Sequence, residues 1–395
     1  MSEERSFDVI VVGAGPAGSM AAREAARRGV RVLLIDKEKF PRYKVCGGGV
    51  APWVIKKLSV PSDIIERHAK RMGVCAPPSY EVLEFEMPTG YYLVFRDKFD
   101  NYLLKLAREA GAKVLEGVRV TDVIFEGDLV RGVKTTRGEF EAKVVIACDG
   151  ATSVVARRAG FWDKWFTEKG ESWEEHMAFC VQSEIALDDE IIDNRIGNKL
   201  MFFAGSRVAP LGYGWIFPKR GIVSVGLGSA VGEFEEKPTE YLRRFIEEHP
   251  VASRLLEGGR IVRAKGSYVP FKHTFKPSYD NGILVAGDAC GHVSPITGEG
   301  IFYAVRAGMI AGEVAAESIR RGDQSAMFLR EYEKRWQRVI GVHLDVQAKI
   351  FEETYAKLKE VEPEDVDKYY GEVLKEAFLK FIQYLLSYIS RKRKG

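Results

Sequence analysis

A glycine motif close to the start of the chain restricts its fold more than any other feature. Gly13, Gly15 and Gly18 have the spacing G-x-G-x-x-G, directly after the β-branched run Val9–Val12 and before Ser19–Arg28, which is rich in Ala and Arg. The two runs predict a strand and a helix joined by a tight glycine turn. A strand, a turn of this kind and a helix form the first unit of a Rossmann-like α/β domain.

Each residue of this unit has a physical role in binding a dinucleotide. Gly13 permits the turn, Gly15 lets the backbone approach a pyrophosphate, and Gly18 lets the helix pack against the strand. The helix N-terminus, where Ala17 lies, offers amide donors and a positive dipole to the phosphates. The next run, VRVLLID, predicts a parallel strand ending in Asp36, whose carboxylate can accept hydrogen bonds from ribose hydroxyls. The sequence therefore predicts a bound dinucleotide, which at this point could be NAD or FAD.

A second glycine-rich stretch, NGILVAGDACGHVSPITGEGI, lies near the other end of the chain. Ile283–Ala286 predicts a buried strand, and the helix that follows opens near Gly300 and Ile301. The stretch resembles the second FAD fingerprint of flavoproteins of the glutathione-reductase and p-hydroxybenzoate hydroxylase types. In that fingerprint the Asp binds ribitol and the helix N-terminus faces the flavin, which implies that Asp288, Gly300 and Ile301 contact FAD. An Asp that caps an ordinary turn is the alternative.

Two intermediate stretches resemble the same superfamily. VVIACDGATSVVARRAG is similar to its Asp-Gly motif, and FRDKFDNYLLKLAREAGAKV is similar to its Arg-x-x-Phe-Asp-x-x-Leu helix. Arg96 matches the arginine that reaches the FAD phosphates in this superfamily, and Val120 matches a backbone contact to adenine. The four motifs occur in the order of the superfamily between Phe7 and Gly308. The resemblance therefore implies FAD as the cofactor.

The middle of the chain has a different pattern. Between about Phe161 and Lys265, apolar residues alternate in runs such as HMAFCVQSEIAL and GIVSVGLGSAV, which predicts an antiparallel sheet. The predicted fold class is α/β, with a Rossmann-like FAD-binding domain of the glutathione-reductase and hydroxylase type, an inserted antiparallel-sheet substrate domain and a C-terminal helical region. The expected ranges are 1–75, 92–160 and 266–322 for the FAD-binding domain, 76–91 and 161–265 for the substrate domain, and 323–395 for the helical region.

Composition excludes several other classes of protein. The 59 Lys and Arg against 56 Asp and Glu leave a formal net charge of +3, which argues against a nucleic-acid partner. The five cysteines are scattered without a C-x-x-C pair, so we expect neither a metal site nor a disulfide framework; Cys148 and Cys180, in apolar runs, are expected in the core.

The start of the chain does not match a signal peptide, and no run reaches the ~18 apolar residues of a membrane span. We therefore expect a cytoplasmic protein, either free or peripheral at the inner face of the cell membrane.

The stretch PLGYGWIFPKRG lies inside the predicted antiparallel sheet. Tyr213 and Trp215 are two residues apart on a strand, so they point to one face and offer broad apolar surface with polar tips. With Pro210, Phe217 and Pro218 they match the pattern P-x-x-Y-x-W-x-F-P of the geranylgeranyl reductase family of flavoproteins, which includes digeranylgeranylglycerophospholipid reductases. That family saturates isolated double bonds of prenyl chains, notably in archaeal ether phospholipids. The resemblance implies a prenyl-lipid substrate lined by the two aromatic residues; aromatics that fill an inter-domain core are the alternative.

The stretch KVCGGGVAPW places Cys46 directly before three glycines. In the geranylgeranyl reductases the corresponding cysteine lies beside the isoalloxazine ring and is implicated in catalysis. The resemblance implies that Gly47 and Gly48 let the backbone lie against the flavin and that Val50 contacts it through its amide. Reduction of an unactivated alkene needs a proton donor near the flavin in a dry cavity. Cys46 is the candidate for that catalytic role, because an ordinary thiol is mostly protonated at neutral pH.

Other activities of the same fold stay open. They are a flavin monooxygenase or halogenase, a dehydrogenase that passes electrons to quinone, and a non-enzymatic prenyl-lipid binding protein. The electron donor is expected to be NAD(P)H or ferredoxin, since no second nucleotide-binding pattern is visible. The tail EAFLKFIQYLLSYISRKRKG could rest on a membrane surface or cover a lipid tunnel, and a core helix with a solvated basic end is equally consistent with it.

Overall fold

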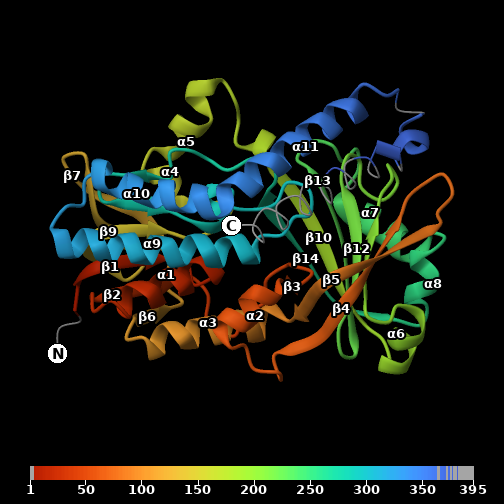
Figure 1. Ribbon diagram of the computed structural model, residues 1–395, viewed down its shortest axis with the longest axis horizontal. Helices are drawn as coiled ribbons and strands as arrows, with labels where there is room; N and C mark the ends of the chain where they lie inside the picture. The colour runs from red at the N-terminus through yellow and green to blue at the C-terminus, as the bar shows by residue number, and fades with distance from the viewer. Residues whose placement is uncertain (1–3, 363–364, 371, 374–375, 377–379, 381–395) are drawn as a thin grey trace, which may run out of the picture.

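The computed structural model describes residues 4–362, 365–370, 372–373, 376 and 380. Two β-sheets form the centres of two halves that lie side by side, and helices cover their outer faces (Figure 1). The first half contains the glycine motif at the start of the chain, and the second contains the stretch with the two aromatic residues.

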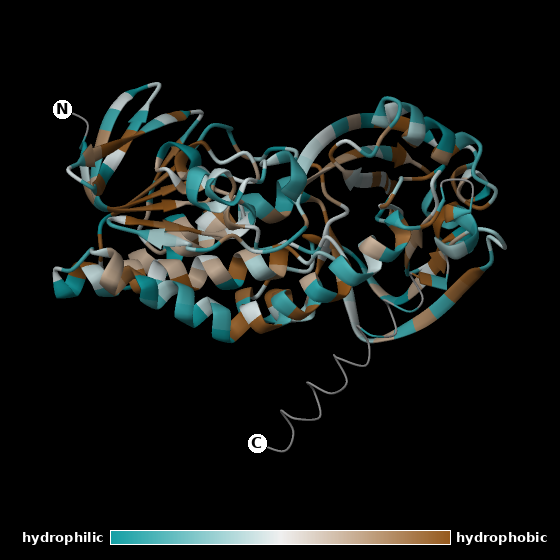
Figure 2. Ribbon diagram, turned by 90° about the horizontal axis from the view of Figure 1, so that it is seen from above, coloured by the Kyte–Doolittle hydropathy of each residue, from teal (hydrophilic) through white to brown (hydrophobic). Residues whose placement is uncertain are grey.

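The first sheet has a parallel centre built around the glycine motif. Its parallel strands, in spatial order, are β16 (Ile283–Val285), β9 (Gly138–Ala147), β1 (Ser6–Val12), β2 (Val32–Asp36) and β6 (Lys113–Glu116). Antiparallel pairs extend it at β15 (Tyr279–Asp280), β8 (Leu129–Thr135) and β7 (Val120–Glu126). The strands beside the glycine motif are buried along almost their whole length, and Figure 2 shows this sheet as largely hydrophobic. Such continuous apolar runs are typical of parallel strands with helices on both faces.

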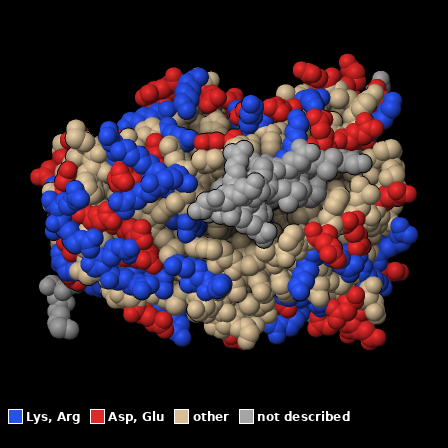
Figure 3. Space-filling view, viewed as in Figure 1, with Lys and Arg blue, Asp and Glu red and all other residues tan. Residues whose placement is uncertain are grey.

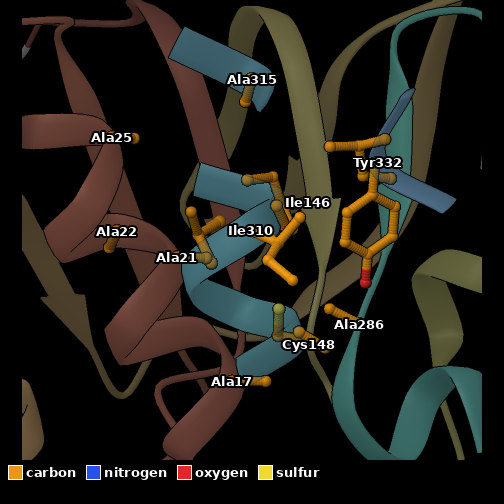
Figure 4. Close-up of a cluster of buried hydrophobic side chains, with 14 of the residues drawn as sticks. Ala17, Ala21, Ala22, Ala25, Ile146, Cys148, Ala286, Ile310, Ala315 and Tyr332 are labelled. Carbon is orange, nitrogen blue, oxygen red and sulfur yellow. The ribbon is translucent and has the colours of Figure 1, made fainter. Parts of the chain in front are cut away.

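Small residues hold two long helices together on one face of this sheet. α1 (Pro16–Ala26) follows the glycine motif and α9 (Ile301–Arg321) follows the second FAD-like motif, so both predicted helices are present. A side chain at Gly308 of α9 would overlap the backbone of Ala17 in α1. Figure 4 shows alanines of α1 facing α9 across this contact. The Ala-rich patterns therefore bring the helices of the two motifs into one layer.

Further helices complete the layers around the first sheet. α3 (Arg96–Glu109) packs beside α1, and α10 (Ala326–Trp336) packs beside α9. The opposite face carries α4 (Val154–Arg158) and α5 (Phe161–Trp165), and aromatic side chains of α5 enter the core with the strands. The sheet is thus covered on both faces, as a Rossmann-like unit requires.

The second sheet is antiparallel except where β11 and β4 run parallel. Its strands, in spatial order, are β14 (Arg260–Pro270), β10 (Met177–Ala186), β13 (Ile222–Ala230), β12 (Tyr213–Pro218), β11 (Lys199–Phe203), β4 (Ile65–Cys75), β5 (Val82–Val94) and β3 (Gly49–Val50). The helices of this half are α6 (Asp189–Arg195), α7 (Pro238–Glu247) and α8 (Ala252–Leu256), which share a core with the sheet. α2 (Pro52–Leu58), which follows β3, packs instead against α1, α3 and α9 of the first half. The predicted fold class, a Rossmann-like FAD-binding unit with an inserted antiparallel sheet and C-terminal helices, is confirmed.

Sheet membership bears on the division into domains. β3, β4, the end of β5 and the last residues of β14 belong to the second sheet, whereas the expected ranges placed 49–50, 65–75, 92–94 and 266–270 in the FAD-binding domain. β4 belongs to the second sheet because it pairs with β5 and β11. β11 lies far along the chain, so its pairing with β4 produces no local pattern in the sequence. We propose a division that follows the sheets, with 49–50, 65–94 and 177–270 in the substrate domain.

Helices continue beyond α10, as predicted for the C-terminal region. A π-helical turn, Gln337–Gly341, leads into α11 (Val342–Lys359). Leu344 packs in the core of the first half, and Leu358 packs against Ala204 of the second half, so α11 links the two (Figure 1). No helix within the described ranges has the length and apolar content to cross a membrane. The apolar and basic residues of the expected amphipathic tail lie outside the described residues: Phe378, Leu379, Phe381, Ile382, Leu385, Leu386, Ile389 and 391–394.

Surface charges are interspersed. Figure 3 shows Lys and Arg side chains mixed with Asp and Glu on one face of the molecule. Arg28 of the segment after α1 lies 2.7 Å from Glu313 of α9, and Glu317 of α9 lies 2.8 Å from Arg335 of α10. Exposed or half-exposed pairs contribute about 0–1 kcal/mol each. The small-residue contact, which buries backbone against backbone, is therefore the stronger constraint on how α9 packs.

We expect Gly308→Ala to lower the free energy of unfolding by about 1–3 kcal/mol, because the added methyl group would overlap the backbone of Ala17. This cost outweighs the roughly 1 kcal/mol that Ala gains over Gly inside a helix. Urea unfolding followed by circular dichroism measures the difference. The exposed Arg320→Ala on the same helix is the control and should change the value by less than about 0.5 kcal/mol. Equal stability of Gly308→Ala and the native chain would contradict the close contact.

Candidate functional site

A cavity of about 1620 Å³ lies at the carboxyl ends of the parallel strands, where residues of the two sheets meet. Its walls include the glycine motif, the end of β2, the loop after β16, and parts of β10, β12 and β14. Open α/β sheets bind their ligands at this edge. In the part of the chain that the structure describes, no group of His, Cys, Asp or Glu side chains is placed to hold a metal ion. This cavity is the candidate functional site.

The three glycines of the first motif differ in their surroundings. Gly13 has a φ of +96°, and a side chain there would overlap the backbone of Cys148. A side chain at Gly18 would overlap the carbonyl of Gly13. At Gly15, in contrast, the nearest atom to an added Cβ would be Nη2 of Arg42, 3.9 Å away. Packing therefore explains Gly13 and Gly18, while the open space beside Gly15, at the N-terminus of α1, fits a pyrophosphate.

Asp36 and Val120 line the cavity close to the carboxyl end of β2. The Asp36 carboxylate accepts hydrogen bonds from the backbone N–H groups of Ala14 at 2.6 Å and Glu38 at 2.8 Å. These two donors hold the carboxylate beside the glycine turn. The arrangement fits the ribose and adenine end of a dinucleotide.

A buried ion-pair cluster lies in the same wall. Arg96, the first residue of α3, donates two hydrogen bonds of 2.8 and 2.9 Å to Asp100, and Nη1 of Arg42 lies 2.8 Å from the same carboxylate. Burial acts to lower the pKa of Arg96, but Asp100 and the sulfur of Cys46 outweigh it and raise the pKa. The Arg96 guanidinium therefore stays charged. Because two guanidinium groups share one carboxylate, the cluster keeps positive charge for a phosphate.

The second FAD-like motif meets the first across this cavity. Asp288, Gly300 and Ile301 line the wall, and an added Cβ at Gly300 would lie 3.4 Å from the Asp288 carboxylate. The turn at Gly287 has a φ of +71°, and its N–H donates to Nδ1 of His292 at 3.1 Å. Burial lowers the pKa of His292 to about 3, so the ring is neutral and Nδ1 remains an acceptor. This hydrogen bond holds the turn that carries Asp288.

Cys46 lines the cavity, and its sulfur acts as a hydrogen-bond acceptor. The Gly48 N–H donates to Sγ at 3.4 Å, and the sulfur acts with Asp100 to raise the pKa of the Arg96 guanidinium. An added Cβ at Gly47 would lie 2.5 Å from the Phe217 ring, and one at Gly48 would overlap backbone of β5. The two glycines therefore make room for the second sheet, in addition to leaving the loop free of side chains at the cavity.

Tyr213 and Trp215 lie on one face of β12, as predicted, with ring centroids 6.0 Å apart, and both line the cavity. The Tyr213 hydroxyl donates to the Thr297 carbonyl at 2.7 Å, and Nε1 of Trp215 donates to the Gln182 side chain at 3.2 Å. The Trp215 ring packs against Gly226, which lies in β13. The run GIVSVGLGSAV is thus a strand of an antiparallel sheet, as predicted.

Beyond this aromatic pair the cavity continues along the second sheet. Apolar side chains from β4, β5, β11 and β12 line this extension: Met72, Phe85, Met87, Leu200, Phe202 and Phe217. The rings of Phe202 and Phe217 meet edge to face with centroids 5.4 Å apart. A wall of this composition favours a hydrocarbon ligand. We call these six residues the apolar extension.

Most of the residues predicted from the sequence converge on the cavity. Gly18 and Val50 do not line it: Gly18 lies beneath the turn, and Val50 is fully buried in the cluster between β3 and α9. The predicted residues that line the cavity are Gly13, Gly15, Ala17, Asp36, Cys46, Gly47, Gly48, Arg96, Val120, Tyr213, Trp215, Asp288, Gly300 and Ile301.

Many further residues line the cavity that were not predicted from the sequence, and four of them carry polar groups or sulfur that bear on its chemistry. Cys180 was expected in the core but is half-buried in the cavity wall, because β10 turns this position toward the cavity and Gly228 leaves space for its sulfur. Arg42 and Lys44 lie in the same wall, and Nζ of Lys44 donates to Ser267 at 2.6 Å. The available signal was that two basic residues stand four and two positions before Cys46. The fourth residue, Glu299, stands alone among the glycines of its loop.

Comparison with known proteins agrees with this geometry. A family model described as an FAD binding domain matches residues 6–344. The digeranylgeranylglycerophospholipid reductase of Methanocaldococcus jannaschii is 36% identical over 334 residues, which cover 84% of this chain and 82% of that protein. The digeranylgeranylglycerophospholipid reductase of Methanosarcina acetivorans is 35% identical over 91% of this chain and 87% of its own length.

Solved structures show the same fold. A geranylgeranyl bacteriochlorophyll reductase-like protein from Thermoplasma acidophilum has a TM-score of 0.83 and 29% identity, with 96% of each chain covered. A flavin-dependent brominase has a TM-score of 0.71 over 99% of this chain and 100% of its own, but its 18% identity shows the shared fold alone.

The fold and the site therefore define an FAD-dependent oxidoreductase, and FAD, predicted from the two glycine-rich motifs, is confirmed as the cofactor. The chain belongs to the FAD binding domain family and, within it, to the geranylgeranyl reductase family that includes the digeranylgeranylglycerophospholipid reductases.

The contrast between two glycines tests where the pyrophosphate binds. Gly15 has φ −73° and open space around it, so Gly15→Ala should fold normally but weaken FAD binding by roughly tenfold or more, since the methyl group occupies the ligand's space. Gly18→Ala, the matched change three residues on, should instead impair folding. Fluorescence titration of the apoprotein with FAD measures the affinity, and thermal unfolding measures stability. A Gly15→Ala variant that binds FAD as tightly as the native chain would place the pyrophosphate elsewhere.

Proposed function

We propose that this chain reduces isolated C=C bonds of geranylgeranyl chains, in ether phospholipids of the archaeal type, with FAD as its redox cofactor. The observation that carries the proposal is the apolar extension, which continues the cavity from the FAD motifs past Cys46 and the Tyr213–Trp215 pair. Both curated relatives described above bear the name of a reductase of digeranylgeranylglycerophospholipid. A prenyl chain is a long hydrocarbon, so a long apolar wall beside the flavin suits it.

The size of the cavity supports a second ligand beside FAD. Pockets for a single small molecule measure about 300–1,000 Å³, whereas this cavity has about 1620 Å³. The walls with the glycine motif, Asp36 and Asp288 suit FAD. The apolar extension is then available for a substrate.

The chemistry of an isolated alkene sets what the protein has to supply. No carbonyl group is present to stabilise negative charge, so a proton must arrive before or together with a hydride. Reduced FAD supplies the hydride when bound. The chain's own residues hold the alkene, donate the proton and keep water away from the positive charge that develops on the tertiary carbon. Phe202, Phe217 and Trp215 suit the last task because they close one side of the cavity with aromatic surface.

Cys46 is the side chain that we propose as catalytic. It raises the pKa of Arg96 in the FAD-binding wall, and the next residue, Gly47, lies against the Phe217 ring of the apolar extension. It therefore lies where the flavin and the double bond would meet. Its sulfur accepts a hydrogen bond from the Gly48 N–H.

Two other functions of this fold make different predictions. A monooxygenase or halogenase would consume oxygen and leave the double bonds of a prenyl chain intact, and a prenyl-lipid binding protein would bind the lipid without turnover. The intact FAD-binding wall argues against the second function. For the partners, we propose NAD(P)H or a ferredoxin as the electron donor, and a peripheral contact with the membrane that contains the lipid.

An anaerobic single-turnover experiment tests the proposed reaction. Bound FAD is reduced chemically and mixed with a digeranylgeranylglycerophospholipid, and the absorbance of oxidised flavin and the mass of the lipid are followed together. We expect oxidised flavin to return in step with the gain of hydrogen by the lipid. Flavin that stays reduced, with a lipid of unchanged mass, would sink the proposal.

Cys46→Ser should bind FAD normally but lower the rate of lipid reduction by about 10²-fold or more, the usual range for loss of a group that acts on the transition state. Cys75→Ser is the matched control, because Cys75 is buried in β4 away from the cavity. Its rate should equal that of the native chain. Full activity in Cys46→Ser would remove the catalytic role of Cys46.

A further inference from the structure

Glu299 lines the cavity, on the loop that follows Asp288 in the second FAD-like motif. An added Cβ at Gly298, the residue before it, would lie 2.6 Å from the Tyr213 hydroxyl, and one at Gly300, the residue after it, would lie 3.4 Å from the Asp288 carboxylate. Tyr213 belongs to the aromatic pair and Asp288 to the second FAD motif. The loop therefore places Glu299 between the wall for FAD and the wall for the proposed substrate.

The two oxygen atoms of Glu299 have different environments. Oε2 accepts a hydrogen bond of 2.9 Å from the Tyr91 hydroxyl, while Oε1 is buried and has no hydrogen-bond partner within the described residues. The Tyr91 ring lies 3.9 Å from where a Cβ of Gly49 would be, so this pair borders the loop that carries Cys46. A buried, unpartnered oxygen is costly for a carboxylate and much less so for a neutral carboxyl group.

Burial raises the pKa of Glu299 to about 7, and the hydrogen bond from Tyr91 acts in the opposite direction. Glu299 and burial together raise the pKa of Tyr91, so that Tyr91 remains a neutral phenol that donates. An ordinary Glu is almost entirely ionised at neutral pH. Glu299, in contrast, keeps its proton up to about pH 7.

Two other acidic protons in this part of the cavity already have acceptors. Lys44 donates to the Ser267 hydroxyl at 2.6 Å, and Tyr213 donates to the Thr297 carbonyl at 2.7 Å, while the Cys46 sulfur accepts from the Gly48 N–H. A proton that is held by a fixed acceptor is less available for transfer to a ligand. Glu299 combines a titratable proton with an oxygen that the described residues leave without a partner.

We infer that Glu299 donates the proton when a double bond is reduced, an inference that rests on the proposed function. The O–H bond of its carboxyl group breaks and a C–H bond forms at one alkene carbon, while the other carbon takes a hydride from reduced FAD. The alkene gains two hydrogen atoms in total, FAD returns to its oxidised form, and the Glu299 carboxylate regains a proton from water. In this reaction the electron-rich sulfur of Cys46 stabilises the positive charge that develops on the other alkene carbon, without forming a bond to it.

Other titratable groups in the surrounding walls could also cause a pH dependence of the rate, so their titration has to be distinguished from that of Glu299. They are Tyr91 on β5, Tyr213 on β12, Asp288 after β16, Tyr303 and Arg306 on α9, and His343 on α11. Burial raises the pKa of Tyr213, and both phenols therefore titrate well above neutrality. His343 is the side chain in this set whose type ordinarily titrates near neutrality. A His343→Gln variant therefore belongs in the test.

The pH profile of the single-turnover rate is the first measurement. Because the protonated carboxyl is the active form, the rate should fall as pH rises through about 7. Glu299→Gln should lower the rate by about 10²-fold or more and lose this fall. Tyr91→Phe should move the midpoint of the fall to a higher pH by about half to one unit, since the carboxylate loses a stabilising hydrogen bond.

Two control variants should leave the midpoint of the fall unchanged: His343→Gln, and Glu317→Gln, a change on α9 outside the cavity. A Glu299→Gln variant with the native rate and profile would overturn the inference.

Infrared difference spectroscopy between acid and alkaline pH is the second measurement, and it needs no turnover. The native protein with bound oxidised FAD should show a protonated-carboxyl band that disappears around pH 7 and is missing in Glu299→Gln. A band that persists in that variant would assign the titration to another carboxyl group and contradict the inference. The two proposals fail differently: a native enzyme that reduces no prenyl lipid removes the proposed function, whereas an active Glu299→Gln removes the inference alone.

Discussion

The close approach of α1 and α9 is the contact on which the rest of the structure depends. Side chains at Gly308 and Gly312 of α9 would overlap the backbone of Ala17 and Ala21 in α1, so the two helices touch through their backbones. This contact is possible because both helices present Ala and Gly at the interface, as Figure 4 shows for α1. It joins residues almost 300 positions apart and brings the loops that precede the two helices to one cavity. Neither glycine-rich motif could form the FAD site alone.

Burial of charge is the second constraint, and it has opposite consequences at two points of the cavity. At Arg96 the charged form persists because Asp100 and Cys46 compensate for lost hydration and raise its pKa. At Glu299 one oxygen lacks a partner among the described residues, so burial raises its pKa to about 7 and favours the neutral acid. A cavity with a permanent cation at the cofactor wall and a neutral acid near the apolar extension suits hydride and proton delivery to an uncharged alkene.

Much of the fold could be predicted because its signals are local. The strand, turn and helix around Gly13 follow from β-branched residues, glycines without space for side chains and good helix formers. The placement of β4 could not be predicted in this way, since its partners β5 and β11 include one far along the chain. The position of the Cys180 side chain could not be predicted from local sequence either. An apolar run indicates a strand, but which face of that strand meets a cavity depends on how the two halves pack.

The sequence by itself determined the cofactor motifs, the order of the two sheets along the chain and the positions of Cys46, Tyr213 and Trp215, because glycine spacing and alternation act over a few residues. Only the tertiary structure decided that these residues share one cavity, that Arg42 joins Arg96 at Asp100, and that Glu299 is buried next to Tyr91. The reason is physical: hydration is lost, and pKa values change, only when segments far apart in the chain close around a side chain and remove it from water.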